Sequence, residues 1–355
     1  MSAIGFGIVG CGNIAHLHAQ ALQAIPQARL VGFCGKGAER ASSLGKKYGV
    51  EWSVDLVSFL ARPEIQAVTL CTPSGTHMEL GCQAAGAGKH VLVEKPIEVT
   101  MEKARRLVEE CEKRKVHLGV IFQSRFLPSV EFLKRALGQE RLGRIIAADA
   151  HVKWFRSRQY YESAPWRGTL ALDGGGALIN QSIHTIDLLQ YLAGPVHSVF
   201  GLAQRQLHHD IEGEDTAVAV VQFKNGAVGV IEGSTSIYPG FSRRVEIHGE
   251  KGSVILDGND IRVWETVEKG EAELGLAALT GKDQSSGASD PMSLEIGGHQ
   301  RQMEDFIEAI FHDRPPRVDG REGMKALAIV LAIYRSAREK RLVEIEELTS
   351  SVGFK

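Results

Sequence analysis

The chain has 355 residues, of which 43% are hydrophobic, and its formal net charge at pH 7 is −2. This length exceeds the size at which a single hydrophobic core stops growing, so we expect two domains. The near-neutral charge, without a block of like charges, excludes the strongly basic surface that nucleic-acid binding requires and favours small-molecule partners.

The cysteines and the N-terminus indicate a reducing compartment. The cysteines are odd in number, lack C-x-x-C spacing and lie in the first third of the chain: Cys11, Cys34, Cys71, Cys82 and Cys111. No Lys or Arg occurs before Arg29, so the charged start of a secretory signal is missing, and no apolar run approaches the roughly 18 residues that span a bilayer. We expect a cytoplasmic protein with reduced thiols.

The first 120 residues alternate short apolar runs with amphipathic helical stretches. The runs are predicted to be strands and cover residues 4–9, 29–34, 67–71, 90–94 and 117–120. This alternation is typical of βαβ units, which build a doubly wound parallel sheet. The pattern ends near residues 122–124, which predicts a first domain of residues 1–123 and a second of residues 124–355.

The second part of the chain has longer runs in which apolar residues alternate. Strands are predicted at residues 145–154, 216–223, 227–235, 243–248 and 254–257, with a tight turn at residues 224–226. The pattern indicates an α/β domain with a large, mostly antiparallel open sheet. Helices are predicted at residues 127–137, 183–193, 300–312 and 322–338. The polar segment 268–298 is predicted to be a long loop, either a lid or a surface decoration.

Gly10, Gly12 and Ala15 form a GxGxxA motif between the first predicted strand and a helix. Glycines in such a turn let the backbone approach a pyrophosphate, and the free N–H groups at the helix N-terminus favour an anion. The motif alone also suits a purely structural turn, but the four βα units that follow favour a Rossmann domain that binds a dinucleotide.

The end of the second predicted strand bears on the choice of dinucleotide. An acidic residue commonly stands there and binds the adenosine ribose. Here Gly35 takes that position, Lys36 follows, and Arg40 lies one helical turn later. The two cations suit a 2′-phosphate and favour NADP or dual use, but they equally suit two solvated charges on a surface helix.

Glu94, Lys95 and Pro96 end the apolar run at residues 90–94. A charge at the end of a buried strand is costly unless it is paired or used, so Lys95 is either a functional amine or half of an ion pair with Glu94 or another acid. Open α/β sheets bind ligands at this carboxyl edge, which makes Lys95 a candidate to steer the proton of a substrate hydroxyl.

Three glycines at residues 174–176 lead into a predicted helix that carries Asn180, His184 and Asp187. Regular helical spacing would place these three side chains on one face. A single helical histidine is more often part of the core than a catalyst, so the spacing alone leaves both roles for His184 open.

Aromatic and basic residues gather upstream of these glycines: Trp154, Arg156, Tyr160, Tyr161, Trp166 and Arg167. They suit stacking on a sugar ring, or simple packing. No metal site is expected, because His16 and His18 are two residues apart and face different ways on a helix, and no other His or acid stands at an obvious ligand spacing.

Together these residues resemble the glucose-fructose oxidoreductase, inositol dehydrogenase and rhizopine catabolism family (Gfo/Idh/MocA). The matching pieces run in family order across nearly the whole chain: Gly10 to Ala15, Cys71-Thr72-Pro73 with His77, Glu94-Lys95-Pro96, Gln123 with Arg125 and Phe126, Trp166-Arg167-Gly168, and Gly174 to Asp187. The resemblance implies a Rossmann domain, an α/β domain whose open sheet forms the contacts of a homodimer or homotetramer, and an active site between the domains.

The resemblance also implies hydride transfer between NAD(P) and a secondary hydroxyl of a sugar, sugar derivative or cyclitol. Lys95 would stabilise the alkoxide, His184 would act as the base, and Asp187 would orient His184. The family often has an aspartate where Asn180 stands and a glycine where Ser182 stands. Asparagine cannot shuttle a proton as a carboxylate can, so we expect Asn180 to hydrogen-bond the substrate, as in relatives similar to nucleotide-sugar 3-dehydrogenases.

The predicted cofactor contacts are Gly10, Gly12, Asn13, Ile14, Gly35, Lys36, Arg40, Thr72, Pro73, His77, Glu94, Lys95, Gln123, Trp166 and Arg167. The predicted substrate contacts are Lys95, Arg125, Arg156, Tyr160, Asn180 and His184. Two other functions suit the same residues: a glycoside hydrolase that oxidises its substrate transiently with a bound cofactor, and a dinucleotide-sensing regulator. A regulator needs neither Lys95 nor His184, which counts against it.

Overall fold

The computed structural model describes residues 3–267 and 296–350 and divides into two compact units. The first comprises Met1–Gln123 and Glu295–Met324, and the second comprises Ser124–Leu294 and Lys325–Lys355. The sequence analysis assigned every residue after 123 to the second domain, whereas the segment Glu295–Met324 returns to the first unit. The loop predicted at residues 268–298 lies, as far as residue 295, outside the described residues.

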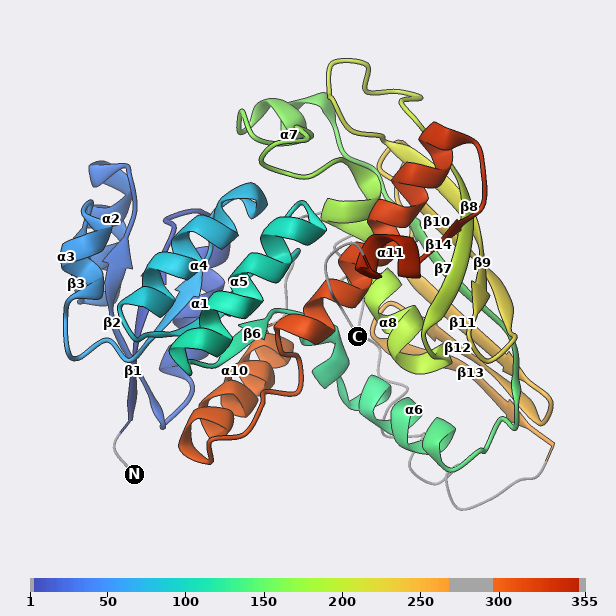
Figure 1. The fold of residues 1–355 in the computed structure, drawn as a ribbon, viewed down its shortest axis with the longest axis horizontal. Coiled ribbons are helices and arrows are strands. Elements are labelled where there is room, and N and C mark those ends of the chain that lie inside the picture. The colour runs from blue at the N-terminus through green and yellow to red at the C-terminus, as the bar shows by residue number, and fades with distance from the viewer. Residues whose placement is uncertain (1–2, 268–295, 351–355) are drawn as a thin grey trace. The chain divides into compact units, whose positions relative to one another are not determined.

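The first unit contains a parallel sheet of six strands in the order β3-β2-β1-β4-β5-β6 (Figure 1). The strands are β1 (Ile4–Val9), β2 (Ala28–Cys34), β3 (Glu51–Ser53), β4 (Ala67–Leu70), β5 (His90–Val93) and β6 (Leu118–Val120). All neighbouring strands pair in parallel, so the predicted doubly wound parallel sheet is confirmed. The prediction missed β3, because this short and largely exposed strand contains no apolar run.

Both faces of this sheet are covered. The helices of the first unit are α1 (Asn13–Gln23), α2 (Ala38–Tyr48), α3 (Leu56–Leu60), α4 (His77–Gly86), α5 (Met101–Arg114) and α10 (Ile296–Phe311), with a 3-10 turn η1 (Ser74–Thr76). Phe6 and Ile8 share a core cluster with α1 and α10, while Gly7 of the same strand lies against Phe59 of α3. The apolar side of α10, with Phe306 against Phe6, explains why this late segment belongs to the first unit.

The second unit contains a sheet of eight strands in the order β13-β12-β11-β7-β10-β9-β8-β14. The strands are β7 (Ile145–Lys153), β8 (Val196–Gln204), β9 (Thr216–Phe223), β10 (Val228–Ser234), β11 (Arg244–Gly249), β12 (Gly252–Asp257), β13 (Asp260–Thr266) and β14 (Val343–Glu344). Every neighbouring pair is antiparallel except β7 with β10. The predicted, mostly antiparallel sheet is therefore confirmed, although β8, β13 and β14 were not predicted.

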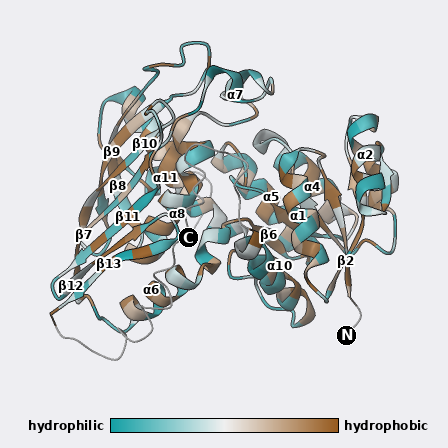
Figure 2. Cartoon of the chain, turned by 180° about the vertical axis from the view of Figure 1, so that it is seen from behind, coloured by the Kyte–Doolittle hydropathy of each residue, from teal (hydrophilic) through white to brown (hydrophobic). Residues whose placement is uncertain are grey.

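The second unit also contains helices, some of which cover one face of this sheet. They are α6 (Pro128–Gly138), α7 (Arg158–Glu162), α8 (Ile183–Ala193), α11 (Gly320–Glu339) and α12 (Glu346–Thr349), with the 3-10 turn η2 (Gln123–Phe126) and the π-helix η3 (Ala177–Ser182). Ser336 of α11 accepts the backbone N–H of Gly201 in β8 over 3.0 Å. Brown and teal alternate along the strands in Figure 2, as expected where one face is covered and the other is open.

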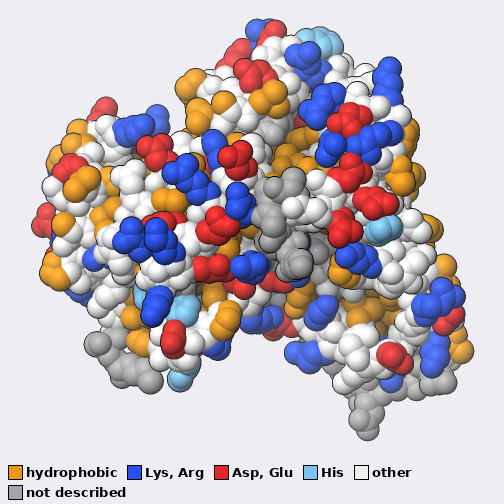
Figure 3. All heavy atoms as spheres, viewed as in Figure 1, with side chains coloured by type: hydrophobic (Ala, Val, Ile, Leu, Met, Phe, Trp, Pro, Cys, Tyr) orange, Lys and Arg blue, Asp and Glu red, His pale blue; other side chains and the backbone are white. Residues whose placement is uncertain are grey.

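The described surface has a mixed charge. On the face drawn in Figure 3, Lys and Arg side chains lie among Asp and Glu side chains. All five cysteines are free thiols in the structure. Within residues 3–267 and 296–350, no helix has the length and apolar character to cross a membrane.

Candidate active site

The glycine turn after β1 is shaped to receive a phosphate group. Gly10 has φ +103°, and a Cβ at that position would lie 2.5 Å from the backbone oxygen of Cys71, so only glycine fits. Gly12 is the N-cap of α1 and makes no side-chain cap bond, and a Cβ there would have no described atom within 4 Å. The open space beside Gly12 and the start of α1 at Asn13 and Ile14 suit a pyrophosphate.

The end of β2 presents exposed charges. Gly35 lies against the Cys11 sulfur, and a Cβ at Gly35 would approach it to 2.7 Å. Lys36 and Arg40 are exposed, and Arg40 is on the first turn of α2. Their contact with a 2′-phosphate stays a prediction.

The turn after β4 is tied to the turn after β5 by a buried histidine. His77 Nε2 lies 3.0 Å from the backbone oxygen of Thr72, and its Nδ1 lies 2.9 Å from that of Pro96. Burial lowers the pKa of His77. The structure thus gives His77 a role that the sequence analysis did not predict, because its ring joins the backbone beside Pro73 to the backbone beside Lys95.

Lys95 lies two residues after the end of β5, at the carboxyl edge of the sheet that also carries the glycine turn. Glu94 precedes it and is buried, and Glu94 Oε2 accepts the backbone N–H of Lys95 over 3.1 Å. The other carboxylate oxygen faces two histidines, His18 and His299, which the sequence analysis did not place near the site. The spacing of His16 and His18 was interpreted correctly, since His16 contacts Tyr48 of α2 instead.

Glu94, His18 and His299 could supply metal ligands, since their ligand atoms lie within 4.8 Å of one another. However, the 2.7 Å between His18 Nε2 and Glu94 Oε1 is a hydrogen-bond distance. The second ring nitrogen of His18 is also engaged, since Nδ1 lies 2.8 Å from the Thr69 hydroxyl. We therefore interpret the group as a hydrogen-bonded cluster.

Gln123 ends the first segment of the first unit and was predicted to line the cofactor. Its Oε1 is buried and has no hydrogen-bond partner among the described residues. A buried acceptor of this kind commonly has a partner in the functional complex. A carboxamide N–H donor of a nicotinamide ring is a chemically suitable partner, so Gln123 fits the predicted dinucleotide.

In the second unit, Arg125 and Asp187 form a buried bidentate ion pair. Arg125 Nε donates to Asp187 Oδ2 over 2.7 Å, and Nη2 donates to Oδ1 over 2.6 Å. Both side chains are at most 3% exposed. The sequence analysis had given these residues separate roles, one toward the substrate and one behind His184, and did not predict that they meet.

The segment that carries Asn180 is not a regular helix. Residues Ala177–Ser182 form a π-helix, and α8 begins only at Ile183. The expectation that Asn180, His184 and Asp187 share one face of a regular helix was wrong, because π-helical winding changes the spacing between Asn180 and His184. His184 is half-buried on the first turn of α8, while Asp187 is fully buried.

Asn180 is part of a hydrogen-bonded chain of polar side chains. Its amide nitrogen donates to the buried Asp173, and its oxygen accepts from Gln181 Nε2 over 2.8 Å. Gln181 also donates to the Tyr160 hydroxyl over 2.8 Å and accepts from Arg156 over 2.9 Å. The sequence analysis missed Asp173 and Gln181, although both flank residues that it selected.

Two arginines lie beside the Tyr160 ring. The Arg167 guanidinium lies 4.1 Å from the ring centroid and that of Arg156 lies 5.5 Å away, while Arg167 also lies 4.8 Å from the Trp166 ring. Arg156 is 3% exposed. The predicted aromatic and basic residues therefore lie together with Asn180 and Gln181 in one cluster.

A buried carboxyl group supports the start of the π-helix. Glu214 accepts the backbone N–H groups of Gly176 over 3.1 Å and Leu178 over 2.7 Å, and the Tyr334 hydroxyl over 2.9 Å. Burial raises the pKa of Glu214 to about 7, against these hydrogen bonds. A Cβ on Gly176 would lie 1.7 Å from the backbone oxygen of Glu214, so the glycine is required for this approach.

The comparisons with known proteins cover nearly the whole chain. The family model "Oxidoreductase family, NAD-binding Rossmann fold" matches residues 4–122, and "Oxidoreductase family, C-terminal alpha/beta domain" matches residues 134–345. The chain is 30% identical to "Myo-inositol 2-dehydrogenase" of Thermotoga maritima, covering 96% of this chain and 98% of that protein. It is 28% identical to "Inositol 2-dehydrogenase" of Rhizobium meliloti, covering 96% and 99%.

A similar solved structure is that of the WlbA dehydrogenase from Bordetella pertussis in complex with NADH and UDP-GlcNAcA. It has a TM-score of 0.89 and 34% identity, and the match covers 97% of this chain and 98% of that one. With the glycine turn, the Lys95 turn and both sheets in place, the chain belongs to the Gfo/Idh/MocA family of NAD-binding oxidoreductases.

Proposed function

We propose that this protein is a dehydrogenase that oxidises a secondary hydroxyl of a nucleotide-linked sugar acid. The observation that carries the proposal is the position of Lys95 two residues after β5, at the same sheet edge as the open glycine turn after β1. Parallel sheets bind dinucleotides and their substrates at this edge. When bound, the nicotinamide cofactor supplies the hydride acceptor.

The residues of the chain handle the proton and the charge of the reaction. His184 removes the proton of the substrate hydroxyl as a general base, and the Lys95 ammonium stabilises the oxygen by a charge-assisted hydrogen bond. Asn180 holds a hydroxyl of the substrate. Hydrogen bonds to Asp173 and from Gln181 fix the orientation of its side-chain amide. The directions in which the amide can donate and accept further hydrogen bonds are therefore set.

The positive charge of two arginines beside Tyr160 supports the proposal that the substrate is acidic. The guanidinium groups of Arg156 and Arg167 both lie within 5.5 Å of the centroid of this ring, and Asp173 accepts a hydrogen bond from Asn180. Guanidinium groups favour carboxylate and phosphate partners, for which a neutral cyclitol offers no counterpart. The relative of 34% identity was crystallised with UDP-GlcNAcA, which makes this compound the first to test.

The open face of the eight-stranded sheet is proposed to bind a second copy of the chain. Phe200, Leu202, Val218, Val220 and Val228 are 40–59% exposed on β8, β9 and β10. Phe200 pairs with Val220, and Leu202 with Val218, so the side chains form one continuous apolar patch. A patch of this kind on a soluble protein is typical of a subunit interface.

The experiment is an absorbance assay of nicotinamide reduction with UDP-GlcNAcA and myo-inositol, each with NAD and NADP. The proposal expects turnover of UDP-GlcNAcA, which Lys95→Ala and His184→Ala each lower by about 10² to 10⁴ while NADH still binds. Arg156→Gln should raise KM for UDP-GlcNAcA about tenfold or more, because it removes a charged partner. Arg158→Gln, which alters an exposed arginine on α7 paired with Glu162, is the control.

Three results would contradict the proposal. Parental rates in both alanine variants would remove Lys95 and His184 from the reaction. Preference for myo-inositol over UDP-GlcNAcA would overturn the acidic substrate. Release of free sugar from a glycoside without net NADH formation would indicate that the protein is instead a glycoside hydrolase that oxidises its substrate transiently.

A further inference from the structure

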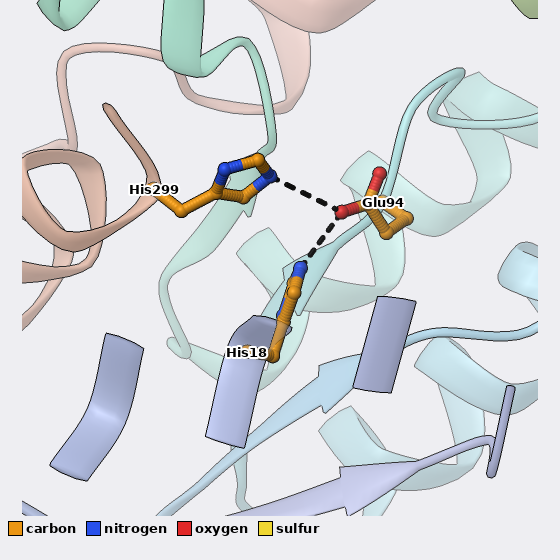
Figure 4. A group of neighbouring side chains, drawn as sticks. All are labelled: His18, Glu94 and His299. Atoms are coloured by element: carbon orange, nitrogen blue, oxygen red, sulfur yellow. Dashed lines mark hydrogen bonds and ion pairs between the residues drawn. The ribbon is translucent and has the colours of Figure 1, made fainter. Parts of the chain in front are cut away.

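Three side chains from separate segments of the first unit meet at one carboxylate oxygen (Figure 4). His18 Nε2 donates to Glu94 Oε1 over 2.7 Å, and His299 Nε2 lies 3.8 Å from the same oxygen. His18 belongs to α1, Glu94 follows β5, and His299 belongs to α10. Their side chains are at most 9% exposed, so the contact is part of the core rather than of the surface.

The remaining polar atoms of His18 and Glu94 are also engaged. His18 Nδ1 lies 2.8 Å from the Thr69 hydroxyl on β4. The Glu94 backbone N–H donates to the Leu70 oxygen over 3.0 Å, and Glu94 Oε2 accepts the Lys95 N–H over 3.1 Å. Glu94 is therefore fixed through its backbone and both carboxylate oxygens, and it holds the backbone of Lys95 in turn.

The electrostatics favour an ionised pair. Burial alone would lower the pKa of His18, but the neighbouring Cys71 and Glu94 raise this pKa to about 10. Burial would raise the pKa of Glu94, but the hydrogen bond from His18 and the charges of His18, His299 and Lys95 hold it well below its usual range. Removing one member would leave a buried charge without compensation.

We propose that His18 is a positioning residue for Lys95: by holding Glu94, it fixes the turn from which Lys95 reaches the substrate hydroxyl. This inference rests on the role proposed above for Lys95. His18 also lies on the helix that begins at the glycine turn, so one contact sets the Lys95 turn relative to the dinucleotide turn. A misplacement of about 1 Å at a reacting group costs on the order of 10²-fold in rate.

The test compares substitutions at two histidines of the same helix. His18→Met removes the donor to Glu94, His18→Gln keeps an N–H donor, and His16→Gln changes the neighbour that contacts Tyr48 instead. With UDP-GlcNAcA, H18M should lower kcat by about 10- to 100-fold, and H18Q should recover part of the loss. The dissociation constant for NADH should stay near that of H16Q, whereas the uncompensated Glu94 charge should lower the melting temperature of H18M.

A double-mutant cycle with Lys95→Ala separates positioning from general damage to the fold. If His18 acts through Lys95, H18M causes little further loss of activity when Lys95 is already replaced. An undiminished further loss would overturn the inference while leaving the role of Lys95 intact. Parental activity of K95A alone would instead refute the proposed function, and the inference with it. If H18M does not fold, Glu94→Gln takes its place in the cycle, with the same expectation.

A second readout does not depend on turnover. Because Glu94 holds the Lys95 amide, H18M should speed hydrogen exchange at that amide by tenfold or more relative to H16Q, measured in the full chain with NADH. Equal exchange in the two variants would contradict the inference. A stoichiometric metal ion lost from H18M would also contradict it, since the cluster would then be a metal site.

Discussion

Arg125 and Asp187 form a bidentate ion pair inside the second unit, with N–O distances of 2.7 and 2.6 Å. Arg125 lies in η2, at the start of this unit. Asp187 lies on the second turn of α8, the helix that carries His184. The Arg125 guanidinium also lies 4.4 Å from the centroid of the Tyr191 ring on α8. The pair therefore fixes α8 and, with it, the position of His184.

Replacing one partner of this pair should destabilise the second unit strongly. Asp187→Asn leaves the Arg125 charge buried without its carboxylate, which costs about 3–5 kcal/mol of unfolding free energy. The double substitution Arg125→Met with Asp187→Leu should recover much of the loss, because no charge is left buried. Urea denaturation of the three proteins measures both effects. Equal stability of D187N and the parent would show that the pair contributes little.

The stability of the protein should depend on pH through Glu214. Its pKa is raised by burial from 4.5 to about 7, so the folded state holds a proton that the unfolded state releases. The contribution is fully present below pH 4.5 and is lost as the pH rises through 7, by on the order of 3 kcal/mol. Denaturation of the parent and Glu214→Gln at several pH values measures it: the difference between them should grow over this range. Glu212→Gln, an exposed neighbour, should keep the parental dependence.

Lys36 and Arg40 are predicted to permit the use of NADP. If their charges meet a 2′-phosphate, the double variant Lys36→Ala with Arg40→Ala should raise KM for NADP by about tenfold or more and leave KM for NAD nearly unchanged. Steady-state kinetics with both cofactors measures this. A parent enzyme that uses NAD alone, or a variant with equal loss for both cofactors, would show that the two cations are merely solvated.

The apolar patch on the eight-stranded sheet predicts the effect of a charge on assembly. Val220→Lys places a cation at the centre of the patch, where burial of an unpaired charge is costly, so the oligomer should dissociate. Light scattering after size-exclusion chromatography measures the molar mass. Val57→Lys, which alters a 71% exposed valine on α3, should leave it unchanged. A parent chain that is monomeric at micromolar concentration would rule out the second copy.

The sequence by itself determined several of the elements and the order of the motifs. The period of the apolar residues predicted β1, α8 and β9 with the boundaries that the structure has, because that period directly reflects which face of an element is buried. The turn chemistry of residues 224–226 likewise predicted the β9–β10 hairpin, where Gly226 has φ +87°. These features depend on neighbours in the chain, so local sequence is sufficient for them.

The tertiary structure decided which distant residues meet. It brought α10 back to the first unit, wound residues 177–182 into a π-helix, and paired Arg125 with Asp187. It also joined His18 to Glu94 across 76 positions of sequence. Such contacts depend on how whole elements pack and on the need to compensate each buried charge. Neither requirement leaves a periodic signal in the amino-acid sequence, which is why spacing alone could not predict them.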